Sequence, residues 1–181
     1  MSSAASRSRH VAGVAALAGA ASLLGLLSPG LYRDEAVIRD GFVVNDLVTL
    51  ALALPVLVVA HLRAERPLPG AVRARLVELG ALHYVLYNYL FYLFGATLNA
   101  ALLLYVAVVA AAGWALARSL RAVDPWEVDG VISDPPARRV AAWMLFVALG
   151  LSITWIAQWA VALHRTAPAT RFDLTPEFVR V

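Results

Sequence analysis

The chain contains neither cysteine nor lysine, and charged residues make up only 15% of its 181 residues. Without cysteine it cannot form disulfides, thiolate metal sites or thiol redox centres. All 15 basic residues are therefore arginines, a bias typical of GC-rich bacterial genomes. The net charge is only +3 and the arginines stand at the ends of apolar runs, so we expect no nucleic-acid partner.

Hydrophobic residues are what the chain has in abundance, at 61%, which exceeds the share of an ordinary soluble domain. They come as runs near the length of roughly 20 residues that a helix needs to cross a bilayer. A soluble fold of this size could not bury so much apolar surface. The sequence therefore predicts an all-α, polytopic transmembrane helix bundle whose first partner is the lipid bilayer.

The runs predict one domain, 1–181, with about five spans, at 11–27, 42–62, 76–94, 100–117 and 140–163. The first run also has features of a signal peptide, because a basic start precedes it and small residues follow. An uncleaved helix is favoured, since the run continues to Leu27. The tail from His164 resembles the approach to a further span, which suggests a chain that is short at its C-terminus.

The arginines predict the orientation, because cytoplasmic loops carry the excess of positive charge. A cytoplasmic N-terminus places ten arginines inside and five outside. The inner ones are Arg7, Arg9, Arg63, Arg66, Arg73, Arg75, Arg118, Arg121, Arg138 and Arg139; the outer ones are Arg33, Arg39, Arg165, Arg171 and Arg180. The expected location is the inner, cytoplasmic membrane, as a multi-pass protein.

Asp46 is the principal polar residue of the second run, about a turn inside its outer end, with Asn45 beside it and Thr49 one turn deeper. Ionisable side chains within spans are costly and commonly functional. One interpretation has Asp46 reach the interface or cap the helix; the other buries it against a polar group of another helix. Pro55, in the middle of the same run, is expected to kink it.

The third run is rich in aromatic and polar side chains, and Tyr84, Asn88, Phe91 and Gly95 share one face with Tyr92 at its edge. Polar groups of other runs are expected at similar depth. The candidate ligand-binding cluster in the outer half consists of Asp46, Asn45, Tyr84, Asn88, Tyr92, Asn99 and Gln158. The alternative is that the same side chains act as polar glue between helices.

His83 is a candidate metal or haem ligand, but no second histidine or Glu-x-x-His pair accompanies it on a helix. Glu78 points to a different face, so a Glu/His pair with His83 is not expected. The acidic segment around Asp124 and Asp129 lacks the ligand spacing of an EF-hand. No metal, cofactor or catalytic motif is predicted.

Two strings, NDLVTLALALP and YNYLFYLFGATLNAALLLYV, resemble a family of bacterial multi-pass integral membrane proteins of uncharacterised function. The resemblance covers about residues 40–110. It is carried by Asn45, Asp46, Pro55, Tyr87, Asn88, Tyr89, Tyr92, Gly95 and Asn99. It implies a multi-pass membrane protein and no particular activity.

Together these features favour a non-enzymatic protein that binds or moves an apolar or lipid-like small molecule, or that serves as a subunit of a homo-oligomer or another membrane complex. One alternative is a membrane enzyme that uses Asp46 or His83 as acid or base, for which no second catalytic group is evident. Another is a structural or assembly helper.

Overall fold

The computed structural model describes residues 3–28, 30–66, 70–129, 131 and 134–166; within these, the side chains of 3–5, 134–137, 155, 158, 159 and 162–166 are outside the description. The chain divides into two units, Met1–Val131 and Ile132–Val181, each taken by itself below. All regular structure in the described residues is helical, as predicted.

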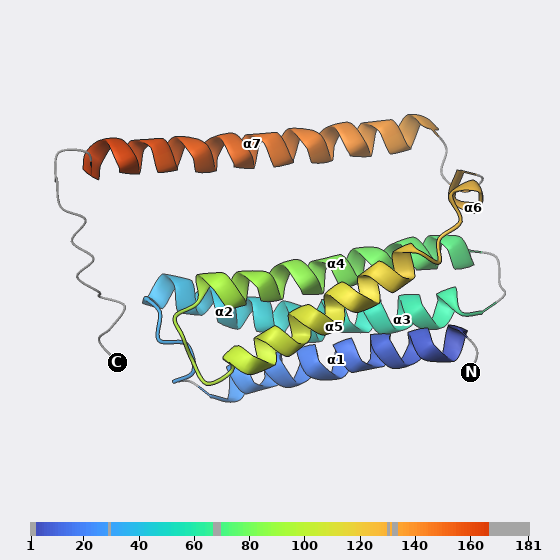
Figure 1. The fold of residues 1–181 in the computed structure, drawn as a ribbon, viewed down its shortest axis with the longest axis horizontal. Coiled ribbons are helices and arrows are strands. Elements are labelled where there is room, and N and C mark those ends of the chain that lie inside the picture. Colours follow the sequence, from blue (N-terminus) through green and yellow to red (C-terminus); the bar gives the residue numbers. More distant parts are fainter. Residues whose placement is uncertain (1–2, 29, 67–69, 130, 132–133, 167–181) are drawn as a thin grey trace. The chain divides into compact units, whose positions relative to one another are not determined.

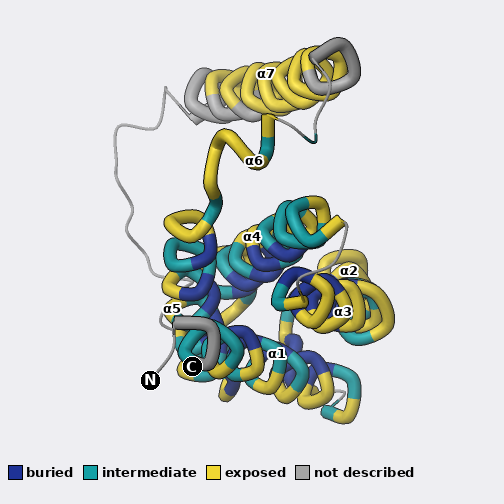
Figure 2. The backbone as a smooth tube through the Cα atoms, turned by 90° about the vertical axis from the view of Figure 1, so that its right-hand side faces the viewer, coloured by how far each residue is buried: buried dark blue, intermediate teal, exposed yellow. Residues whose placement is uncertain are grey.

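The first unit is a bundle of four antiparallel rods followed by a short helix (Figure 1). Its elements are α1 (Ser3–Leu27), α2 (Ala36–Val48), the π-helical turn η1 (Thr49–Ala53), α3 (Leu54–Ala64), α4 (Ala71–Gly95), α5 (Leu102–Leu120) and α6 (Pro125–Asp129). Elements α2, η1 and α3 follow one another without a break and form one rod. Viewed from the end, α1 packs against α5 and α3, and α4 closes the ring between α3 and α5 (Figure 2).

The long rod accommodates Pro55 with a wide turn. The backbone N–H of Leu54 bonds the carbonyl of Thr49, five residues back, and Pro55 then stands in the first turn of α3. The first turn of a helix tolerates proline, because the N–H that proline lacks would have no partner within the helix at that position. π turns are rare and occur mostly as single turns within α-helices. The irregularity expected at Pro55 is here a π turn just before it.

Short, specifically bonded loops join the rods. Gly70 has φ +94°, a left-handed conformation that favours glycine. Helix α4 begins at the next residue, Ala71. At the other end of the bundle, Asp34 accepts hydrogen bonds from the backbone N–H and the hydroxyl of Thr97, at 2.9 and 2.8 Å. These bonds tie the α1–α2 connection to the α4–α5 loop.

The core combines small residues with large aromatic ones. Val14, Ala18 and Ala21 bury one stripe of α1 at helical spacing, and Ala112 and Ala115 do so on α5. Such small residues let helix backbones approach closely in membrane bundles. The volume near the other end is filled by rings in mutual contact: Tyr32, Phe42, Tyr89, Tyr92 and Tyr105.

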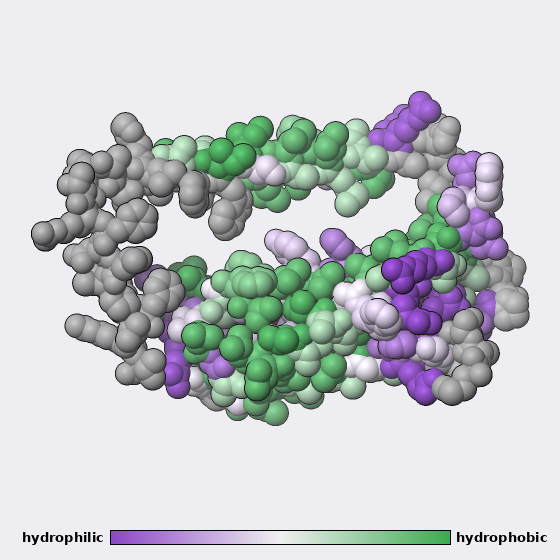
Figure 3. Space-filling model, in the orientation of Figure 1, coloured by the Kyte–Doolittle hydropathy of each residue, from purple (hydrophilic) through white to green (hydrophobic). Residues whose placement is uncertain are grey.

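The outside of the unit is largely apolar. Leu52, Leu62, Leu103 and Trp114 are each more than half exposed. Figure 3 shows apolar side chains over the middle of the bundle and polar ones toward its ends. Among the described residues, three helical segments are long and apolar enough to cross a membrane: Ser6–Leu27, Ala36–Ala64 and Leu102–Leu120.

The structure thus has three candidate spans among its described residues, not the five that the sequence predicts. The predicted span 76–94 is a helix, α4, but Glu78, His83, Asn88 and its tyrosines make it too polar to qualify. The predicted span 140–163 lies within α7 (Asp134–Thr166), the helix of the second unit, several of whose side chains are outside the description. Its described apolar side chains, such as Leu145 and Ile153, are exposed.

Candidate functional site

Buried polar side chains gather at both ends of the four-helix unit. The Asp46 cluster joins α1, the α1–α2 connection, the long rod and α4, and comprises Ser22, Tyr32, Asp46, Thr49, Asn88, Tyr89 and Tyr92. The Glu78 cluster joins α1, α3, α4 and α5 at the arginine-rich end and comprises Ser8, His61, Glu65, Arg75, Glu78 and Ser119.

Asp46 is held by two tyrosine hydroxyls. Tyr32 donates to Oδ2 at 2.6 Å and Tyr92 to Oδ1 at 3.1 Å, and the Tyr92 hydroxyl also lies 2.9 Å from the carbonyl oxygen of Phe42. The carboxyl is almost fully buried, with 1% of the residue exposed. The 2.6 Å distance is in the range of a charge-assisted O–H···O bond.

A second layer of hydrogen bonds surrounds this carboxyl. The Tyr89 hydroxyl lies 2.9 Å from Ser22 Oγ and donates to the carbonyl of Ala18 at 2.8 Å. The side-chain amide of Asn88 donates to Thr49 Oγ1 over a longer 3.4 Å. These bonds connect α4 to α1 and to the π turn, so the cluster links three rods through α4.

The cluster is closely packed around Asp46. Gly25, on α1, faces both the carboxylate oxygen of Asp46 and the hydroxyl of Tyr32, and a Cβ at this glycine would clash with both atoms. Only glycine lets the backbone of α1 come so near to the carboxyl. In this conformation the cluster leaves no room for a ligand between Asp46, Tyr32 and α1.

No arginine or histidine pairs with Asp46 among the described residues, so hydrogen bonds alone compensate its burial. Burial, and next the bond to Asp46, raises the pKa of the Tyr32 hydroxyl above its ordinary value. Tyr32 therefore stays protonated at neutral pH and remains a donor to the carboxyl.

Of the residues predicted to form a site, the structure brings together Asp46, Asn88 and Tyr92. Asn45 is half-buried beside Asp46 and makes no side-chain hydrogen bond within the described part of the chain. Asn99 lies instead in the α4–α5 loop, where its side chain bonds the backbone of Thr97 and Ala101. The hydroxyl of Tyr84 is buried without a hydrogen-bond partner in the described residues.

Gln158 belongs to α7 in the second unit, and its side chain lies outside the described residues. The buried face of α4 also differs from the prediction. The buried face runs through Leu82, Val85, Tyr89 and Tyr92. Tyr92, predicted at the edge of the polar face, is buried, and Phe91, predicted on that face, is 47% exposed. Ligand binding by the predicted residues stays a prediction.

The Glu78 cluster is centred on a fully buried carboxylate. Glu78 Oε1 accepts a bond from Ser119 Oγ at 3.0 Å, and its Oε2 lies 3.3 Å from His61 Nδ1. The other ring nitrogen of His61, Nε2, lies 3.0 Å from Ser8 Oγ. Hydroxyl, imidazole and carboxylate thus stand in a row that crosses from α1 through α3 to α4.

Arg75 extends this cluster to the surface. Its guanidinium reaches Glu78 Oε2 at 3.4 Å, Glu65 Oε1 at 3.1 Å and the carbonyl of Ala64 at 3.2 Å. Arg7, from α1, lies 3.3 Å from the same Glu65 oxygen. Arg7, Arg75 and Glu78 therefore each meet a side chain of opposite sign at this end of the bundle.

Sequence reasoning set Glu78 aside and found neither its burial nor its partners. His83, the histidine considered for it, is exposed on α4, whereas His61, on the neighbouring helix, is buried and faces it. Glu78 within an apolar run and His61 at the end of the preceding run were the available signals. Tyr32, alone in a polar connection, had no signal that tied it to Asp46.

The chain matches no family model, no curated protein and no solved structure. The described residues hold no group of three or more histidine, aspartate or glutamate side chains that suits a metal ion. The interpretation of both clusters therefore depends on their geometry.

Proposed function

We propose that this chain is a multi-pass membrane protein that acts by binding apolar or lipid-like molecules within the bilayer. The inverted distribution of polarity carries the membrane location, and the binding surface must lie outside the Asp46 cluster, which is closely packed. Asp46, Glu78 and His61 are buried inside the four-helix unit, whereas large apolar side chains such as Leu62 and Leu103 are exposed outside it. In a bilayer the solvent is hydrocarbon, so such an exterior is solvated and buried polar groups must pair internally.

The polarity of the two ends supports an orientation with the N-terminus in the cytoplasm. At the end that holds the Glu78 cluster lie Arg7, Arg9, Arg63, Arg66, Arg73, Arg75, Arg118 and Arg121, against Arg33 and Arg39 at the other. Positive charge is retained on the cytoplasmic side. Helix α4 runs beside α3 and α5 at the same level, so it lies at membrane depth even though its own composition is too polar to qualify alone.

The absence of native cysteine makes a direct test of topology possible, because every introduced thiol is unique. Leu98→Cys, in the α4–α5 loop, should react with a membrane-impermeant maleimide in intact cells. Ala122→Cys, at the arginine-rich end, should react only after the membrane is opened. Release of the protein by an alkaline carbonate wash would contradict membrane integration, and the reverse labelling pattern would contradict the orientation.

A second candidate function, acyl transfer or hydrolysis, is favoured by one observation, the row Ser8–His61–Glu78. Serine hydrolases use a hydroxyl whose proton passes to an imidazole that a carboxylate orients. The tautomer with its proton on Nδ1 would donate to Glu78 and leave Nε2 free to accept from Ser8, at 3.3 and 3.0 Å. Glu78 also bonds Ser119 and Arg75, which equally fits a structural tie between helices.

A fluorophosphonate probe separates the two roles of this row. An activated Ser8 should be labelled, and Ser8→Ala should abolish the labelling while His61→Gln reduces it. An unlabelled wild-type protein would exclude the hydrolase and leave the row as a tie between α1, α3 and α4.

A further inference from the structure

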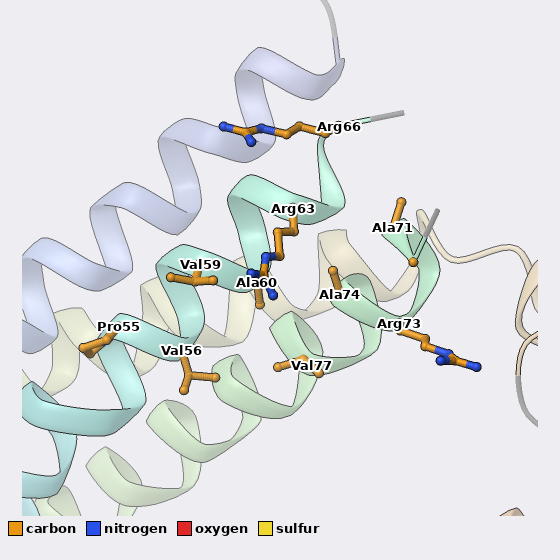
Figure 4. Close-up of a pocket in the computed structure, with 11 residues that line it drawn as sticks. Pro55, Val56, Val59, Ala60, Arg63, Arg66, Ala71, Arg73, Ala74 and Val77 are labelled. Atoms are coloured by element: carbon orange, nitrogen blue, oxygen red, sulfur yellow. The ribbon is translucent and has the colours of Figure 1, made fainter. Parts of the chain in front are cut away.

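A groove of about 670 Å³ runs along the outside of the bundle between α3 and α4, and its lining includes no residue of either buried cluster. Figure 4 shows its two walls and the arginines at its end. It is lined by Pro55, Val56, Val59, Ala60, Arg63 and Arg66 from the first side, and by Gly70, Ala71, Arg73, Ala74 and Val77 from the second.

The groove exists because small residues stand where the two helices meet. Ala60, Ala71 and Ala74 fill little space along the seam, while Val56, Val59 and Val77 form taller walls that are 37%, 47% and 49% exposed. Residues 56, 59, 60 and 63 recur at the spacing of one helix face, so the lining is continuous along α3. The groove begins where the π turn ends, at Pro55.

Charge and apolar surface are separated along the length of the groove. Arg63, Arg66 and Arg73 all lie near the α3–α4 turn, whereas Pro55 and Val56 lie about 12 Å deeper at helical rise. In Figure 4 the guanidinium of Arg63 lies over the groove, whereas the side chains of Arg66 and Arg73 start at its rim and point away from it on opposite sides. The lining includes no acidic residue.

These three arginines have no acidic partner among the described residues. The nearby Glu65 is instead engaged by Arg7 and Arg75, at 3.3 and 3.1 Å. Guanidinium groups bind phosphate oxygens with two parallel hydrogen bonds, and basic pockets between helices on the cytoplasmic side are suited to anionic headgroups. The groove therefore offers positive charge at the membrane surface and an apolar channel below it.

We propose that this groove binds one anionic phospholipid of the cytoplasmic leaflet, with its phosphate at Arg63 and an acyl chain along Val56, Val59 and Val77. The site rests on the proposed membrane location and orientation, because only then do the arginines stand at headgroup level. A second copy of this face is disfavoured, since a two-fold axis along the membrane normal, which the proposed orientation requires, would place the arginines of one copy against those of the other.

Native mass spectrometry of the full chain, purified from membranes and offered equal amounts of phosphatidylglycerol and phosphatidylcholine, tests this site. The wild type should retain phosphatidylglycerol preferentially. Combined Arg63→Gln, Arg66→Gln and Arg73→Gln substitutions should reduce that preference by about 100-fold, at roughly five-fold for each arginine. Arg121→Gln is the matched control, because Arg121 is exposed at the same end and does not line the groove.

A second variant tests the channel and not the charge. Ala74→Leu keeps every arginine and fills the floor, so it should lower retention of both lipids, with a thermal unfolding midpoint near that of the wild type. Unchanged phosphatidylglycerol retention in the triple-glutamine variant, or in Ala74→Leu, would overturn the proposal. Cross-linking of Val59→Cys to a cysteine introduced into α7 would also overturn it, because the chain itself would then cover the groove.

The proposed function fails separately from this site. If a carbonate wash releases the protein, membrane integration is wrong and the lipid site falls with it. If the protein stays in the membrane but shows no preference for phosphatidylglycerol over phosphatidylcholine, only the lipid site is wrong.

Discussion

Asp46 illustrates how a carboxyl is kept inside an apolar bundle without a cation. The hydroxyls of Tyr32 and Tyr92 donate to its two oxygens from different segments, and Gly25 lets α1 close over them. An unpaired polar group in hydrocarbon costs several kcal/mol, roughly 4–8 on cyclohexane scales, so each donor matters. Substitutions at Gly25 and Tyr92, which both contact Asp46, test how much this arrangement contributes to stability.

Gly25→Ala should destabilise the bundle by about 1–3 kcal/mol, because the new Cβ must push the side chains of Asp46 and Tyr32 away from α1. Gly13→Ala is the matched control on the same helix. A Cβ there has no atom within 4 Å, and the helix gains up to about 1 kcal/mol from the exchange of glycine for alanine. Denaturant unfolding in detergent micelles measures both. Equal effects of the two substitutions would contradict close packing at Asp46.

Tyr92→Phe and Tyr105→Phe should differ in their cost although both rings are buried in the same aromatic cluster. Loss of the Tyr92 hydroxyl removes one of the two donors to Asp46, together with the bond to the Phe42 carbonyl, and should cost about 1.5–3 kcal/mol, the value for a hydrogen bond to a charged group. The Tyr105 hydroxyl makes no hydrogen bond of good geometry in the described residues, although Tyr32 and Asn99 lie near it, so its removal should cost much less.

Thermal unfolding of the purified variants, followed by circular dichroism, compares these two tyrosines. A Tyr105→Phe variant that is as unstable as Tyr92→Phe would show that the Tyr105 hydroxyl has a partner after all.

At the scale of the elements, α4 is the polar rod of the bundle, and its polar side chains serve both ends. Glu78 is completely buried near its start, and Asn88 and Tyr92 bond the long rod near its end. A helix with this composition is stable at membrane depth only because its neighbours satisfy its polar groups. The same polar residues explain why α4 does not qualify as a span by composition alone.

Glu78→Ala should be among the most damaging single changes at the arginine-rich end. It leaves His61, Arg75 and Ser119 without the carboxylate that joins them, and removing one partner of a buried ionic group costs about 3–5 kcal/mol. Glu65→Gln, in a side chain that is 20% exposed, should cost less than about 1 kcal/mol. Denaturant midpoints of the two variants, compared with the wild type, check the difference. Similar losses would mean that the Glu78 cluster contributes no more than a surface pair.

The sequence was sufficient for the helices but not for their mutual rotation. The predicted runs coincide with helical segments to within about two residues, because long apolar runs flanked by arginine, proline and glycine leave few other structures. Pairs such as Tyr32–Asp46 and His61–Glu78 depend on which faces meet across different segments. Periodicity places a residue on a face of its own helix, but it does not identify the side chain that this residue meets on a neighbouring helix. Tyr92, at the predicted edge of the polar face of α4, is for this reason central in the structure.

At the scale of the whole molecule, the hydrophobic core lies within the first unit. Every residue of the described core, from Val11 on α1 to Ala115 on α5, precedes Val131. Both polar clusters are complete within the same boundaries.

A chain that ends at residue 131 should therefore fold in detergent with an unfolding midpoint close to that of the full protein. The reason is that it retains the whole described core and every hydrogen bond of the Asp46 and Glu78 clusters. A chain that ends at residue 100 is the matched control. It lacks α5, and with it Tyr105, Val108, Ala112 and Ser119, so it should aggregate or unfold at a much lower temperature. Size-exclusion chromatography and thermal unfolding distinguish the two chains. If the longer one also fails, the bundle requires α7 as a packing partner, and the four-helix unit is not independently stable.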